Sequence, residues 1–228
     1  MSRILKVVRL QLINKQTFVW VPLIVLGSAL AISVAIYAMI PVDTPKYGGG
    51  GQAPLWYFFA MGLSALTLTF PFSQAMSITR RDFFLGTMVA ATLGALLMAA
   101  AFLVGGWIED VTNGWGVNGY VFRFPWLWEA GPLAAGLFYF ALAMFFFVIG
   151  FTGATIYKRW GAAMTTVVSV GSGLILVALA FLVTRLELWG QVGQTIVWLG
   201  ALGLTLWALV VIAVLMAISY LVLRRATP

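Results

Sequence analysis

Long apolar runs separated by short polar connections are the feature that most restricts how this chain can fold. A helix needs about 20 predominantly apolar residues to cross a hydrocarbon core about 30 Å thick. Six segments of the 228-residue chain reach that length, near 18–40, 54–76, 84–107, 132–156, 162–183 and 196–223. Because 63% of the residues are hydrophobic and only 8% are charged, a water-soluble domain could not cover itself with polar surface. We therefore predict an all-α, polytopic membrane protein whose six transmembrane helices form a single domain over 1–228.

The charged residues are distributed unevenly among the connections. Ten basic residues precede the first span or lie in the second connection, the fourth connection and the tail: Arg3, Lys6, Arg9, Lys15, Arg80, Arg81, Lys158, Arg159, Arg224 and Arg225. The first, third and fifth connections hold three basic and five acidic residues: Lys46, Arg123, Arg185, Asp43, Glu109, Asp110, Glu129 and Glu187. Since Lys and Arg accumulate in cytoplasmic loops, this asymmetry predicts that both termini are cytoplasmic. The net charge of +7 therefore follows membrane topology, and no nucleic-acid partner is expected.

Segment 2–16 is too polar to span a membrane and too apolar for a free tail. Four apolar residues share one face of a helix drawn through it: Ile4, Leu5, Val8 and Leu12. Arg3, Lys6, Arg9 and Gln16 lie largely opposite, although Lys15 falls on the apolar face. This pattern predicts an N-terminal interfacial helix that lies against membrane lipid.

The connection between the second and third spans carries the most informative motif. It reads Ser77-Ile78-Thr79-Arg80-Arg81-Asp82-Phe83-Phe84-Leu85-Gly86-Thr87. Thr79 followed three residues later by Asp82 resembles a capping box, with an acid in the first turn where the helix dipole favours it. We therefore expect a short helix over 77–84 along the membrane surface, which presents two arginines and two phenylalanines. The alternative is that the arginines only anchor topology and the phenylalanines only pack at the interface.

This motif resembles the segment between the second and third membrane helices in permease subunits of type-2 ATP-binding-cassette exporters. In that family the segment forms a coupling helix that rests on the ATP-hydrolysing subunit. The resemblance also covers the six-span layout and the cytoplasmic termini. It implies a bacterial plasma-membrane location, separate ATPase subunits as partners, and a second permease chain in a homo- or heterodimer. The implied coupling residues are Ser77, Ile78, Thr79, Arg80, Arg81, Asp82, Phe83 and Phe84. It further implies short re-entrant helices before the last span, although 184–195 is short for a complete pair.

Several kinds of chemistry have no residues to support them in this sequence. The chain holds no Cys and no His, so thiol chemistry and the usual metal ligands are excluded, and no cofactor is expected. It has no Gly-x-x-x-x-Gly-Lys-Ser/Thr phosphate loop, and no charged residue lies inside the six expected spans. A carrier of this kind needs a separate protein that supplies the energy for transport. Its substrate is expected to be amphipathic or apolar: a lipid, a drug or an antimicrobial peptide. The alternatives are a non-transporting scaffold or immunity-type protein that recruits a cytoplasmic partner, and then a membrane-embedded enzyme.

Two features inside the spans predict local behaviour. Pro71 removes a backbone bond to the carbonyl of Thr67, so we expect a kink there, either as a static bend or as a hinge. Small residues recur at four-residue spacing in the fifth span: Gly161, Thr165, Ser169 and Gly173. Such a face is typical of a helix-packing seam, whose partner is either the same chain or a second copy.

The outer connections differ in composition. The run Gly48–Gly51 predicts a flexible loop, because glycine carries the highest conformational entropy. The connection over 108–131 is rich in aromatic residues, which are typical of a membrane-interface belt. A partly ordered outer cap or a substrate exit surface is the more specific interpretation of that connection.

Overall fold

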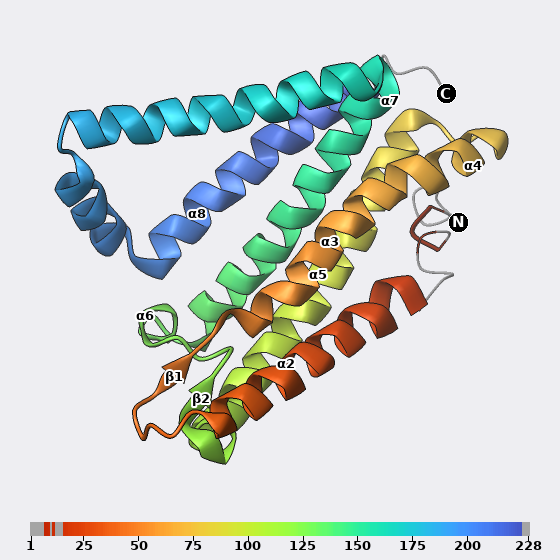
Figure 1. The fold of residues 1–228 in the computed structure, drawn as a ribbon. Coiled ribbons are helices and arrows are strands. Elements are labelled where there is room, and N and C mark those ends of the chain that lie inside the picture. The colour runs from red at the N-terminus through yellow and green to blue at the C-terminus, as the bar shows by residue number, and fades with distance from the viewer. Residues whose placement is uncertain (1–6, 10, 12–15, 225–228) are drawn as a thin grey trace.

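The computed structural model describes residues 7–9, 11 and 16–224, and they are almost entirely helical (Figure 1). The helices are α2 (Val21–Met39, continuing a π-helical turn Gln16–Trp20), α3 (Ala53–Ser64), α4 (Phe70–Ala75), α5 (Arg80–Val111), α6 (Pro125–Trp128), α7 (Pro132–Arg185) and α8 (Trp189–Leu223). Two short strands, β1 (Lys46–Tyr47) and β2 (Gly119–Tyr120), pair in parallel. Proline stands in the first turn of α6 and α7, which follow non-helical residues, so its missing N–H costs no helical bond there. The predicted all-α class is confirmed.

Five helical stretches among the described residues are long and apolar enough to cross a membrane, whereas the hydrophobic pattern predicts six spans. The longest, α7, has 54 residues, which at 1.5 Å per residue would extend about 80 Å as one straight helix. It is not straight, because Gly161 adopts φ 78 and ψ −176, outside helical geometry. The chain turns sharply there (Figure 1). The break falls between the predicted fourth and fifth spans, and the total of six spans stays a prediction.

The last helix is broken in the same way. Gly200 has φ 58 and ψ −171, and it divides α8 into 189–199 and 201–223. Figure 1 shows the first piece set at an angle to the second. A single short helical piece therefore precedes the last long helix. The family resemblance implies a pair of re-entrant helices there, and the sequence is short for a complete pair.

The core lies where α3, α5 and the first half of α7 meet. Close approach of two helices depends on glycine: a Cβ on Gly62 would stand 2.0 Å from the carbonyl oxygen of Phe147, and one on Gly150 would stand 2.1 Å from that of Phe59. Large buried rings fill the core: Phe58, Phe70, Phe83, Phe147 and Phe151. Small residues thus let α3 and α7 pack backbone to backbone, as membrane helices commonly do.

Residues 162–185 leave this core and extend away from it (Figure 1). Gly161, Ser169 and Gly173 of the predicted seam are exposed and Thr165 is half-buried. A Cβ on Gly161 or Gly173 would meet nothing within 4 Å, and the Thr165 hydroxyl donates to the Gly161 carbonyl of its own helix. The described part of the chain therefore supplies no partner for the seam, and the other alternative, a second copy, stays a hypothesis.

The second span departs from α geometry where proline predicts it. A π-helical turn, Ala65–Thr69, joins α3 to α4, and Pro71 is in the first turn of α4. The Thr67 hydroxyl donates to the Leu63 carbonyl at 3.1 Å. The distortion is thus present at Thr67 and Pro71, while motion about it stays a prediction.

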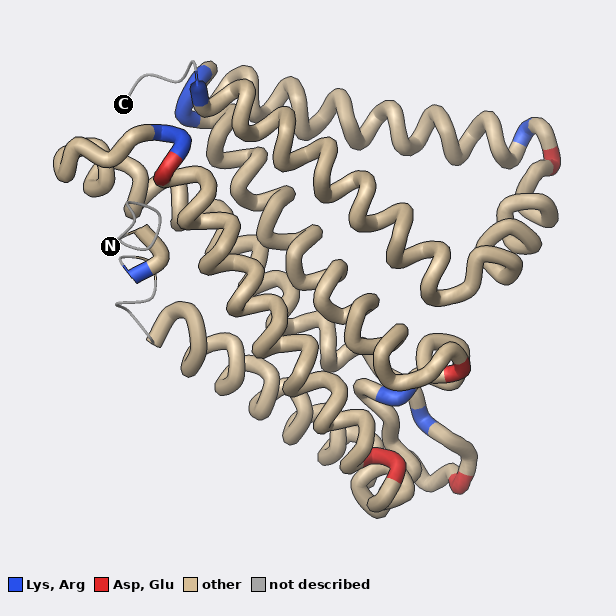
Figure 2. The backbone as a smooth tube through the Cα atoms, turned by 180° about the vertical axis from the view of Figure 1, so that it is seen from behind, with Lys and Arg blue, Asp and Glu red and all other residues tan. Residues whose placement is uncertain are grey.

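Charged residues concentrate at the ends of the bundle (Figure 2). At one end, Arg80 donates to the carbonyl of Arg224 at 2.7 Å, and Arg159 and Arg224 line a common hollow. At the other end, Arg123 pairs with Asp110 at 2.9 Å. The predicted interfacial helix over 2–16 lies mostly outside the described residues, of which 7–9 and 11 are helical and Gln11 Nε2 donates to Thr87 Oγ1 at 3.1 Å.

The glycine contact between α3 and α7 generates a test with a control in the same helix. Gly150→Ala should lower the free energy of unfolding by about 1–3 kcal/mol, because its Cβ would overlap the Phe59 carbonyl. Gly153→Ala should leave stability unchanged or raise it by up to ~1 kcal/mol, because nothing lies within 4 Å and alanine favours the helix. Thermal unfolding in a nonionic detergent measures both. Equal thermal unfolding midpoints for the two variants would contradict the close packing of Gly150 against α3.

Candidate functional site

The turn between α4 and α5 contains the predicted coupling residues. Thr79 is the N-cap of α5: its hydroxyl oxygen accepts the Asp82 N–H at 3.1 Å and its hydroxyl donates to Asp82 Oδ2 at 2.7 Å. Ser77 adopts φ 56, the Ile78 N–H donates to the Ser73 carbonyl at 3.1 Å, and the Ile78 carbonyl accepts Gln74 Nε2 at 3.1 Å. The predicted helix start is therefore confirmed, and the turn before it is held by hydrogen bonds.

The orientation of the two phenylalanines corrects the sequence interpretation. No separate short helix occupies 77–84, because α5 begins at Arg80 and continues to Val111. Phe83 is completely buried and meets Phe70 edge to face at 5.1 Å between ring centroids. Phe84 packs against Tyr220 at 5.2 Å and Phe151 at 5.9 Å. Both rings belong to the core, since the apolar stripe of α5 faces inward from its first turn.

Other residues of this turn are accessible instead. Phe72 is 57% exposed and Met76 is 56% exposed, and their four-residue spacing places them on one helical face. Arg81 is exposed, whereas Arg80 is half-buried and tied to α8 through Arg224. We call Phe72, Met76 and Arg81 the α4–α5 tip. The spacing of Phe72 and Met76 was visible in the sequence, but both were assigned to the interior of the second span.

At the opposite end of α5, a buried carboxylate organises the aromatic connection. Glu109 is completely buried, and its Oε1 accepts Trp115 Nε1 at 3.0 Å and the Val121 N–H at 2.8 Å. Its Oε2 accepts the N–H groups of Phe122 at 2.9 Å and Arg123 at 2.8 Å. Four donors thus satisfy one charge, which a buried carboxylate requires. The sequence placed Glu109 in a loop after a span ending near 107, so this role was not predicted.

The glycine run packs against this connection rather than forming a flexible loop. Gly49–Gln52 is a 3-10 helix, and a Cβ on Gly48 would overlap the Tyr37 ring. Lys46 Nζ donates to the carbonyls of Tyr37, Ile40 and Val117 at 2.9, 3.0 and 3.2 Å, so its charge caps the end of α2. Tight packing explains why glycine stands here, and a 3-10 helix takes the place of the predicted loop. We call residues 43–52 and 112–131 together the outer cap.

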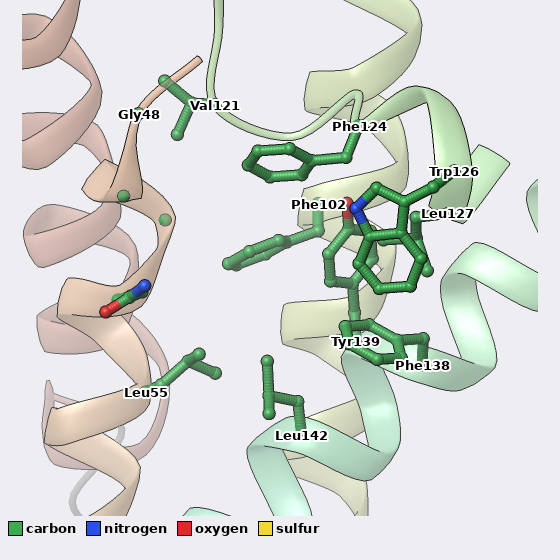
Figure 3. A pocket seen from close by; sticks show the side chains of 13 residues that line it. Gly48, Leu55, Phe102, Val121, Phe124, Trp126, Leu127, Phe138, Tyr139 and Leu142 are labelled. Carbon is green, nitrogen blue, oxygen red and sulfur yellow. The ribbon is translucent and has the colours of Figure 1, made fainter. Parts of the chain in front are cut away.

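A pocket of about 190 Å³ lies between the outer cap and the helices (Figure 3). Figure 3 shows aromatic side chains from α5, the connection and α7 gathered around it, among them Phe102, Trp126 and Tyr139. Leu55 and Leu142 lie at the end away from Phe124. The lining is almost wholly apolar, so the pocket suits an alkyl chain or a ring.

A second hollow of about 740 Å³ adjoins the pocket and shares Trp126 with it. Unlike the pocket, this hollow carries charge, and its lining includes Asp110, Arg123 and Glu129 together with Tyr47 and Trp128. The Arg123 guanidinium pairs with Asp110 and lies 5.2 Å from the centre of the Trp128 ring. Among the described residues, no cluster of three or more Asp or Glu is placed to hold a metal ion.

Comparison of the chain with protein-family models, with curated proteins and with solved structures gave no match.

The Glu109 carboxylate provides a direct test of the outer cap. Glu109→Gln should lower the free energy of unfolding by on the order of 2–3 kcal/mol, because the new amide group would face N–H donors that need an acceptor. Hydrogen exchange of the 119–124 backbone should become faster. Asp110→Asn, the matched control, removes only a partly exposed ion pair and should cost about 1 kcal/mol or less. Unchanged hydrogen exchange in Glu109→Gln would contradict this role.

Proposed function

We propose that this chain is the membrane-spanning permease subunit of an ATP-driven exporter in a bacterial plasma membrane. It provides the path for an amphipathic or apolar substrate, such as a lipid, a drug or an antimicrobial peptide. Separate ATP-binding-cassette ATPase subunits supply the energy. The proposal starts from the resemblance of Ser77–Thr87 to the coupling segment of type-2 permeases.

The α4–α5 tip is the observation that carries the proposal. It projects an apolar pair, Phe72 and Met76, beside the exposed cation Arg81 at the basic end of the bundle. Aromatic and arginine side chains are the groups that dominate binding energy at protein interfaces. Two features attach the tip to the bundle: the Thr79 cap, and the burial of Phe83 against Phe70. A partner bound at the tip would therefore be coupled to α5 and α3.

The distribution of charge supports an external source of energy. In the described helices, Lys, Arg, Asp and Glu stand near the helix ends or beside the Gly161 break, and the buried Glu109 is fully engaged by four N–H donors. Proton-coupled carriers need ionisable side chains inside the bundle that can gain and lose a proton. The described part of this bundle offers none in that position.

The exposed second half of α7 supports a second permease chain. Its apolar residues include Leu174, Leu176 and Val177, which are 64%, 67% and 67% exposed in the single chain. The predicted seam of Gly161, Thr165, Ser169 and Gly173 lies along this same stretch. A second copy, or a related permease, would cover part of this surface, and lipid would cover the rest.

A non-transporting scaffold that recruits a cytoplasmic partner is the second candidate function. The same exposed tip favours it, since a docking surface does not by itself require transport. The two functions differ in whether the bound partner hydrolyses ATP at a rate that depends on this chain.

The coupling test compares an aromatic and a charged residue of the tip with an exposed aromatic and an exposed charged residue elsewhere in the chain. Phe72→Ala with Arg81→Glu should reduce recovery of the ATPase subunit, and the ATP hydrolysis this chain stimulates, by at least tenfold. The reason is that each buried interface anchor contributes about 2 kcal/mol or more. The control is Trp198→Ala with Glu187→Arg, two exposed positions outside both the tip and the second half of α7, and it should change neither.

Pull-down from membranes, with insertion and thermal stability checked in parallel, measures this difference. Equal recovery of the ATPase with both double variants would contradict the docking role of the tip. A partner that is lost with the tip variant but never hydrolyses ATP would favour the scaffold instead.

The orientation of the chain can be tested because the sequence contains no cysteine. The basic end of the bundle should face the cytoplasm. A thiol in Ala75→Cys, beside the tip, should then react with a membrane-impermeant maleimide only after the cells are permeabilised. A thiol in Ala130→Cys, in the outer cap, should react in intact cells. Both positions are exposed in the single chain, so a reversed labelling pattern would overturn the orientation.

A further inference from the structure

The geometry points to a binding site in the outer cap for an amphiphile with an ammonium head group, whose tail enters the apolar pocket and whose head lies in the charged hollow. Binding at this site does not require the proposed transport function, because neither part of the site includes residues of the α4–α5 tip or an ATPase. It is defined by two adjoining spaces of opposite character that share the wall formed by Trp126.

The apolar pocket fits the end of an alkyl chain. Its volume of about 190 Å³ exceeds the roughly 150 Å³ of a cavity that stays dry and binds benzene. Phe102, Phe138 and Tyr139 line its walls, and the Tyr139 hydroxyl donates to the Phe122 carbonyl instead of pointing free into the space. Two further ring contacts keep these walls in place: Phe102 lies 4.7 Å from Tyr139 and 5.1 Å from Phe122 between centroids. The pocket is therefore preformed and offers almost no polar group to a ligand.

The adjoining hollow favours a positive head group. It contains the carboxylates of Asp110 and Glu129 against the single guanidinium of Arg123. Arg123 is already neutralised by Asp110 at 2.9 Å, so the exposed Glu129 is left to attract a cation. An anionic head would meet an excess of negative charge there, whereas an ammonium group would meet complementary charge.

Aromatic rings around the hollow add a second reason for a cation. Tyr47, Tyr120, Trp126 and Trp128 line it, and Tyr47 stacks on Tyr120 at 5.5 Å and on Phe124 at 6.0 Å between centroids. Electron-rich ring faces attract quaternary ammonium groups, most strongly where several rings converge. Tyr47 and Trp126 are 48% and 49% exposed, so their faces are accessible to a ligand. The same Arg123 guanidinium already lies over Trp128, which shows that this ring accepts a cation.

Calorimetric titration of the purified full chain in a nonionic detergent tests the site with three short, water-soluble probes. Hexyltrimethylammonium should bind with saturation. Tetramethylammonium, which lacks the tail, and hexyl sulfate, which has the opposite charge, should each bind at least tenfold more weakly. Equal binding of hexyl sulfate, or no saturable binding of hexyltrimethylammonium, would overturn the proposal.

Variants separate the head and tail positions. Glu129→Gln should weaken the binding of hexyltrimethylammonium about fivefold or more. The control Glu187→Gln, which changes an exposed acid far along the chain, should leave this affinity unchanged. Leu142→Trp should fill the pocket and reduce the affinity for hexyltrimethylammonium to the affinity for tetramethylammonium. Because Glu129 is exposed, its variant should fold even if the Leu142 variant does not. An affinity for hexyltrimethylammonium that is the same in Glu129→Gln as in the natural chain would refute the head-group assignment.

Discussion

The outer half of this molecule depends on one buried carboxylate. Glu109 would be expensive to bury alone, and it is tolerated because Trp115 and three consecutive backbone N–H groups point at its two oxygens. Those bonds fix Val121, Phe122 and Arg123, and through Phe122 they place the carbonyl that Tyr139 and Trp128 both contact. The apolar pocket and the charged hollow are built on this short stretch of backbone. The buried Glu109 carboxylate therefore fixes the backbone that shapes both the apolar pocket and the charged hollow.

The inner half depends on a different constraint, the requirement of the lipid that backbone polar groups bond within the chain. Helices meet that requirement, and the departures from helical geometry occur at residues suited to them. Gly161 and Gly200 adopt positive φ where α7 and α8 break, and a π-helical turn precedes Pro71. Along most of their length the described helices carry no charged side chain, because Lys, Arg, Asp and Glu stand near the helix ends or beside the Gly161 break. Contact instead depends on shape, as in the approach of Gly62 and Gly150 to the opposite backbones.

Sequence reasoning succeeded where short-range chemistry decides the outcome. The Thr79–Asp82 cap could be predicted because its two residues are only three positions apart. The long apolar helices could be predicted from the length of the apolar runs alone. It failed where distant segments meet. Phe83 was assigned to the surface because it follows two arginines, yet Phe70 from another helix covers it. Glu109 and Gly48 were assigned to loops because their partners, at 121–123 and Tyr37, are remote in sequence. No local pattern records such pairings.

Under the proposed function, α5 is the element that connects the two ends of the molecule. It has 32 residues and extends about 48 Å, from the Thr79 cap beside the tip to Glu109 beneath the outer cap. A partner that moved its first turn could not move α5 alone, because Phe83 packs against Phe70 and Phe84 packs against Tyr220. The displacement would have to carry the π-helical segment before α4 and the end of α8 with it. At the far end the same helix supplies Phe102 to the apolar pocket, so the shape of the pocket would respond to events at the tip.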